Sequence, residues 1–127
     1  MPIRKTTEAI DMPFELKWTI EASEQYAALK KSAEEVSKHR ASSRRSKSSR
    51  QEGLFKQVAK TINLLKQNPR HSGLCCHIYQ GLQHPYDAGE RVWEAYAQNK
   101  TPSAYRVFWG YGPERGWLTI IAITPHP

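Results

Sequence analysis

Two residues in the C-terminal stretch "AYRVFWGYGPERGWLTIIAITPHP" are of types that could perform chemistry. Arg106 lies inside one run of aromatic and β-branched residues, and His126 follows a second run of this kind. A guanidinium can hold a phosphate through its fork of N–H donors, and an imidazole accepts or donates a proton near neutral pH. Together the two residues predict phosphate chemistry, provided that the fold brings them close.

Two further candidates lie on the preceding segment, "RVWEAYAQN" (91–99). Successive side chains of a strand point to opposite faces, so Glu94 and Tyr96 are expected on the face opposite Trp93 and Ala95. Glu94 could serve as a general base, and Tyr96 as a stacking platform for a nucleobase or as a hydroxyl donor.

The strand expected at 104–111 follows the same alternation. It directs Val107 and Trp109 into the core, and directs Arg106 and Phe108 to a face that we expect to stay partly open. There Arg106 would hold a phosphate while a base stacks on Phe108. A plainer interpretation is also open, in which Arg106 forms a surface ion pair with Glu94 that contributes little stability and His126 belongs to a frayed terminus. If Arg106 stabilises the charge on a scissile phosphate, its replacement by alanine should abolish toxicity and leave the fold intact.

Metal and cofactor chemistry receive little support from the sequence. Cys75, Cys76 and His77 are of ligand types, but no second pair follows at zinc-site spacing. Strand alternation also separates Cys76 from the other two, and Cys76 with Leu74 and Ile78 is interpreted as core. The chain has no Gly-rich phosphate loop, GxSxG or HExxH motif. We expect no metal and no cofactor.

The positive charge of the chain is concentrated in one segment. The formal net charge is +7, and the stretch "KHRASSRRSKSSR" (38–50) carries six cations and no acid, which leaves the rest near +1. This Ser-rich segment is either a solvated linker or an arm that neutralises nucleic-acid phosphates. In the second case the binding residues would be Arg40, Arg44, Arg45, Lys47 and Arg50.

The length of 127 residues predicts a single domain over 1–127, with a loose arm at 1–12. No apolar run is long enough to span a membrane, and the N-terminus lacks the apolar region of a signal peptide. Two adjacent cysteines do not form a disulfide framework. We therefore expect a cytoplasmic protein without a membrane partner.

The expected elements give an α+β order. "FELKWT" (14–19) alternates as a half-buried strand. Apolar stripes at helical spacing begin at Ala22 and at Leu54, with Ser23 a candidate cap for the first helix, and Asn68-Pro69 ends the second. The basic inter-helix segment covers 38–51. Strands are expected at 74–80, 91–99, 104–111 and 117–124. This order predicts a helical hairpin packed on a mostly antiparallel sheet of four to five strands.

This order of elements, the Tyr105-Arg106 pair that opens the penultimate strand, and the ending "LTIIAITPHP" resemble the RelE/ParE superfamily of toxins from toxin–antitoxin systems. The resemblance covers residues 14–127 and implies a small toxin that a cognate antitoxin protein holds inactive. It implies either a metal-independent endoribonuclease that cleaves ribosome-bound mRNA and inhibits translation, or a ParE-like toxin that binds DNA gyrase. A third alternative is an inactive homologue that binds only an antitoxin or nucleic acid.

For the ribonuclease, the resemblance makes Arg106 the cation at the phosphate and His126 the general acid. Glu94 and Tyr96 stand where RelE itself carries lysines, so Glu94 is expected to act as the base, as a glutamate does in some relatives.

Overall fold

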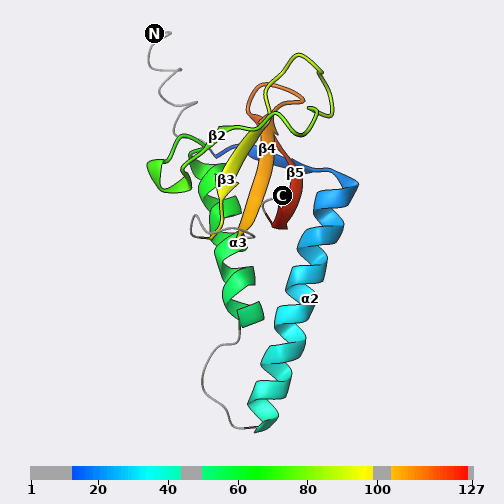
Figure 1. Cartoon of the computed structure of the whole chain (residues 1–127), viewed down its shortest axis with the longest axis vertical. Coiled ribbons are helices and arrows are strands. Elements are labelled where there is room, and N and C mark those ends of the chain that lie inside the picture. The colour runs from blue at the N-terminus through cyan, green and yellow to red at the C-terminus, as the bar shows by residue number, and fades with distance from the viewer. Residues whose placement is uncertain (1–12, 44–49, 99–103, 126–127) are drawn as a thin grey trace.

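The part of the chain that the structure describes folds into two long helices and five strands. Figure 1 shows their arrangement. The computed structural model describes residues 13–43, 50–98 and 104–125, with the backbone alone described at 39–43. Its elements in chain order are β1 (Glu15–Trp18), α2 (Ile20–Ser43), α3 (Arg50–Gln67), a 3-10 turn (Ser72–Leu74), β2 (His77–Ile78), β3 (Trp93–Tyr96), β4 (Tyr105–Tyr111) and β5 (Trp117–Pro125).

The five strands form one sheet in the order β1-β5-β4-β3-β2. β1 pairs with β5 in parallel, and the other neighbours pair antiparallel. The α+β architecture with a mostly antiparallel sheet is therefore confirmed. Both helices contact the same face of the sheet, α2 over β5 and α3 over β4, and both extend well past its edge (Figure 1).

The first helix begins at a cap that the sequence analysis misplaced. Thr19 Oγ1 accepts a hydrogen bond from the backbone N–H of Ala22 at 3.0 Å, which satisfies one of the free donors of the first turn. Ser23 lies inside α2, so its predicted role as the cap is wrong. The hydroxyl of Thr19 also donates a hydrogen bond to the carbonyl of Ile121 in β5 at 2.7 Å. Ile121 directly follows Ile120, the last residue of β5 that pairs with β1. The side chain of Thr19 thus joins the start of α2 to the edge of β5.

The inter-helix boundaries differ from the prediction. α2 continues through Lys38 to Ser43, and α3 already begins at Arg50, so every described residue of the predicted connector 38–51 is helical. No Gly or Pro interrupts 38–43, and helix propagation adds one backbone hydrogen bond per residue once a helix exists. The C-terminal end of α3 at Gln67 agrees with the predicted stop at Asn68-Pro69.

The helix-facing side of the sheet contains the main core. Strand residues such as Val107, Trp109, Leu118 and Ile120 pack against helix residues, and Val58, Ile62 and Leu65 of α3 are all buried. The helical spacing of these α3 residues produces this apolar stripe. The predicted assignment of Val107 and Trp109 to the core is confirmed.

The opposite face of the sheet is covered, which contradicts the expectation of an open face. Phe108 is only 2% exposed and packs in a second cluster with Val92, Ile121 and Ala122. A bulge opposite Phe108 and Trp109 shifts the alternation of β5, so that Ile121 and Ala122 both join this cluster. The connection between β2 and β3 supplies the cover, because Tyr79 packs on Phe108 with ring centroids 4.7 Å apart.

The same connection is fixed to β4 by His84, which is 4% exposed. Its Nδ1 accepts from the backbone N–H groups of Tyr86 and Asp87, so Nε2 is the nitrogen that donates to the carbonyl of Tyr111 at 2.7 Å. The ring lies so close to Gly110 that a Cβ there would stand 2.7 Å from His84 Cδ2. Glycine at position 110 therefore allows the imidazole to seat against the strand.

The strand predicted at 74–80 is mostly absent. Cys75 has a left-handed backbone with φ 51°, a conformation that interrupts an extended chain, and only His77 and Ile78 pair with β3. Leu74 is buried as expected and Cys76 is half-buried against the core, but Ile78 is 42% exposed. The predicted core position of Ile78 is wrong. The strand predicted at 91–99 is likewise shortened, to Trp93–Tyr96.

Candidate functional site

The candidate site is built around Glu94 of β3. Alternation along β3 sends Trp93 and Ala95 to the helix-facing core and Glu94 and Tyr96 to the opposite face. The Glu94 side chain is only 1% exposed. A carboxylate is rarely buried without partners, because an ionised group loses much hydration free energy on leaving water. The groups around Glu94 therefore decide what the site can do.

Arg106 is the first of these groups. It stands opposite Tyr96 in the pairing of β3 with β4, and its guanidinium carbon lies 4.0 Å from the centre of the Tyr96 ring. Its Nε is 3.5 Å from Glu94 Oε2, yet makes no hydrogen bond within the described residues. Nη1 donates to the carbonyl of Ala104 at 3.0 Å. Arg106 is thus held between an aromatic ring, a carboxylate and its own strand.

The burial of Arg106 corrects both interpretations drawn from the sequence. The residue is 3% exposed, so it neither lies on an open face nor forms a surface ion pair, although the predicted partner Glu94 is right. The covered sheet face explains the difference. A buried pair is a weak source of net stability, but the removal of one partner is strongly destabilising.

His77 is the second group beside Glu94, and the sequence analysis considered it only as a metal ligand. It stands opposite Glu94 in the pairing of β2 with β3. Its Nε2 is 2.6 Å from Glu94 Oε1, and its side chain is 49% exposed. The imidazole also contacts the Tyr96 ring, with centroids 5.5 Å apart and the ring planes at 69°. His77 is therefore the most exposed of the four residues, and the buried carboxylate of Glu94 lies directly behind it.

The structure brings together three of the predicted catalytic residues, Arg106, Glu94 and Tyr96, and adds His77. His126 lies outside the described residues. Thr124, two positions before it, pairs with Arg106, and β5 ends at Pro125. Phe108 stands opposite Glu94 in register but packs in the second apolar cluster, so its predicted role as an open stacking surface is wrong.

Most of the arginines and lysines predicted to bind nucleic acid cannot be placed in the structure. Arg44, Arg45 and Lys47 lie outside the described residues, and the Arg40 side chain is not described within α2. Arg50 is exposed at the first residue of α3. The role of this segment in binding stays a prediction.

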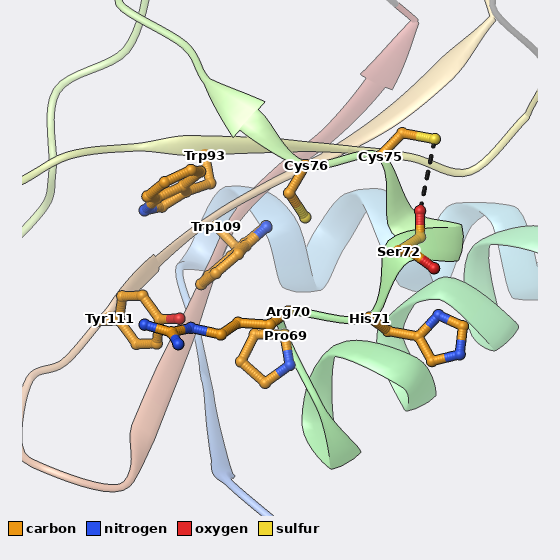
Figure 2. A pocket seen from close by; sticks show the side chains of 9 residues that line it. All are labelled: Pro69, Arg70, His71, Ser72, Cys75, Cys76, Trp93, Trp109 and Tyr111. Atoms are coloured by element: carbon orange, nitrogen blue, oxygen red, sulfur yellow. Dashed lines mark hydrogen bonds between the residues drawn. The ribbon is translucent and has the colours of Figure 1, made fainter.

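A separate pocket of about 380 Å³ lies on the helix-facing side of the sheet, where the chain leaves α3. Figure 2 shows Trp93, Trp109 and Tyr111 along one side of it, with Arg70 extending toward Tyr111. The Trp93 and Trp109 rings are stacked with centroids 6.0 Å apart. The pocket and the Glu94 cluster therefore use opposite faces of β3.

The adjacent thiols on the pocket wall should differ in reactivity. Cys75 is exposed, whereas Cys76 is half-buried and burial raises the pKa of its thiol. A raised pKa leaves less thiolate, the reactive form, at pH 8. We expect iodoacetamide to label the Cys76→Ser variant, which retains Cys75, faster than the Cys75→Ser variant. Equal rates by mass spectrometry, with both variants folded, would contradict the assigned burial of Cys76.

Within the described ranges, no group of three or more His, Cys, Asp and Glu side chains is arranged to hold a metal ion. No described helix has the length and apolar character needed to cross a bilayer.

Comparisons with known proteins show the fold. No family model and no curated protein matches the sequence. The structure is similar to that of a YoeB/ParE toxin from Agrobacterium tumefaciens, with a TM-score of 0.57 over 89% of this chain and 99% of the other. The fold is RelE/ParE-like. The two sequences are only 12% identical, so the likeness extends to the arrangement of helices and strands, and the predicted RelE/ParE-like architecture is confirmed.

Proposed function

We propose that this protein is the toxin of a toxin–antitoxin pair, held inactive by a cognate antitoxin protein, and that it acts as an endoribonuclease on mRNA. The RelE/ParE-like fold supports the first part. The second part rests on one observation, the convergence of Glu94, Arg106 and Tyr96 with His77 on one face of the sheet. A carboxylate, a cation and an imidazole in contact are suited to proton transfer beside a phosphate.

In the proposed reaction the 2′-hydroxyl of the RNA attacks the adjacent phosphorus. Glu94 takes part in the general-base catalysis that removes the proton of the 2′-hydroxyl. Arg106 supplies positive charge beneath the phosphate, where the low dielectric of its surroundings strengthens the interaction. The half-buried ring of Tyr96 offers a surface for a base. His126, which follows the last residue of β5 in the sequence, is assigned to protonate the leaving 5′-oxygen. No metal or cofactor takes part in this scheme.

A second candidate is favoured by the enclosure of Arg106. Its side chain is only 4% exposed, so a phosphate oxygen would reach the guanidinium only after the cluster rearranges. A toxin that binds DNA gyrase needs no cation at a scissile phosphate. The second candidate is therefore a non-catalytic gyrase-binding toxin with the same fold.

The test is induced expression in a bacterial host, followed by growth, pulse-labelled protein and DNA synthesis, and transcript integrity. We expect growth arrest with rapid loss of translation and cleaved transcripts. The matched control is Arg115→Ala, a change of an exposed arginine in the turn between β4 and β5, which should remain toxic. Arrested DNA synthesis with intact transcripts would establish the gyrase candidate instead, and the absence of any effect would refute both.

A further inference from the structure

Glu94 is placed too deep to touch an RNA hydroxyl. Its side chain is 1% exposed, one carboxylate oxygen lies 2.6 Å from His77 Nε2, and the other lies 3.5 Å from Arg106 Nε. A general base must come within hydrogen-bond distance of the proton that it abstracts, directly or through one water. The buried carboxylate must therefore act through a neighbour that solvent reaches.

His77 has the geometry of that neighbour. Its side chain is 49% exposed, and its ring contacts that of Tyr96 at a steep interplanar angle. Because a carboxylate only accepts hydrogen bonds, Nε2 carries the proton in the contact with Glu94. Nδ1 of the neutral ring then carries a lone pair that can accept a proton.

From this arrangement, and resting on the proposed ribonuclease function, we infer that His77 is the general base and that Glu94 is a positioning residue. Nδ1 of His77 takes the proton from the 2′-hydroxyl while the 2′-oxygen forms a bond to phosphorus. The bond from phosphorus to the 5′-oxygen breaks, and the general acid protonates that oxygen. The products are a 2′,3′-cyclic phosphate and a 5′-hydroxyl.

The ion pair explains how the ring is held in this orientation. Arg106 lies beside one carboxylate oxygen of Glu94, and the other oxygen faces Nε2–H of His77. A carboxylate behind an imidazole fixes the tautomer and stabilises the imidazolium that forms during proton transfer. Glu94 therefore contributes through the orientation of His77, without contact with RNA.

The role of His77 can be tested by measuring transcript cleavage in a cell-free bacterial translation reaction. Free and ribosome-bound mRNA are both present in such a reaction. His77→Ala is expected to slow cleavage about 10²- to 10⁴-fold, the usual contribution of a general base. Added imidazole should restore part of this activity, because the half-exposed position leaves the site open to solvent. His71→Ala, which removes an exposed histidine outside the cluster, is the matched control and should cleave like the wild type.

A spectroscopic readout tests the positioning role of Glu94. In the wild type, ¹⁵N NMR should find the neutral His77 ring protonated at Nε2. Glu94→Gln should weaken this preference and slow cleavage, and imidazole should not restore the rate, because His77 is still present.

These measurements distinguish the role of His77 as general base from the ribonuclease function itself. A His77→Ala variant that cleaves within twofold of the wild type would overturn the inference and leave the ribonuclease function standing. A wild-type protein that cleaves no transcript would refute the ribonuclease function, and the role of His77 as a base with it.

Discussion

Glu94→Ala is expected to lower the free energy of unfolding by about 3–5 kcal/mol, the usual effect of breaking a buried ion pair from one side. The change leaves Arg106, which is 3% exposed, without the carboxylate beside its Nε. Arg106→Ala should have a similar effect, because it removes the guanidinium beside the buried Glu94 carboxylate. Urea unfolding followed by tryptophan fluorescence measures both values.

A double variant tests whether the two charges act as a pair. Glu94→Leu with Arg106→Met removes both charges and keeps apolar volume, so its loss of stability should be clearly smaller than the sum of the two single losses. Glu114→Ala changes an exposed carboxylate in the turn between β4 and β5 and should alter stability by less than about 0.5 kcal/mol. Strictly additive losses would show that Glu94 and Arg106 do not interact.

This coupling changes how activity data on Arg106 should be interpreted. The prediction that Arg106→Ala abolishes toxicity with the fold intact requires that the side chain contribute little to stability. Because the side chain is buried beside Glu94, a loss of activity in that variant could result from unfolding alone. His77 is a better position for a functional test, since its side chain is half-exposed and its removal leaves the buried pair in place.

The sequence correctly predicted the helices and strands in which apolar residues recur with a clear periodicity. The stripe Val58, Ile62 and Leu65 recurs at helical spacing and is buried in α3 as expected. Alternation in "WEAY" correctly separated Glu94 from Trp93 and Ala95. These predictions succeeded because helix and strand periodicities are local properties that burial of one face imposes on the sequence.

The cover of the second sheet face depends on contacts that have no local period. Residues 79–92 form an irregular connection, and nothing in its spacing predicts that Tyr79 packs on Phe108 or that His84 seats against Gly110. The contact of His77 with Glu94 also depends on the register of two distant strands. The sequence therefore identified Glu94 and Arg106 as candidates but could predict neither their burial nor the histidine beside them.

The largest loss among core substitutions is expected for Trp109→Ala, about 3–5 kcal/mol. Trp109 is 1% exposed, stacks on Trp93 and meets the Tyr111 ring with centroids 5.1 Å apart. Truncation at this position removes contacts with the whole helix-facing core and opens a cavity. Trp117→Ala, at a half-buried position at the start of β5, should lose clearly less stability in the same urea unfolding experiment.

Trp109→Phe should be much milder than Trp109→Ala. Phenylalanine keeps an aromatic ring in the core, and it removes a buried indole Nε1–H that meets the geometric criterion for a hydrogen bond with no described residue and has only a weak interaction with the thiol of Cys76. The loss of a poorly satisfied donor removes part of a desolvation penalty, which offsets some of the lost packing. If Trp109→Phe lost as much stability as Trp109→Ala, the indole N–H would have to make a hydrogen bond in the folded protein, and the thiol of Cys76 on the same pocket wall would be the acceptor to examine.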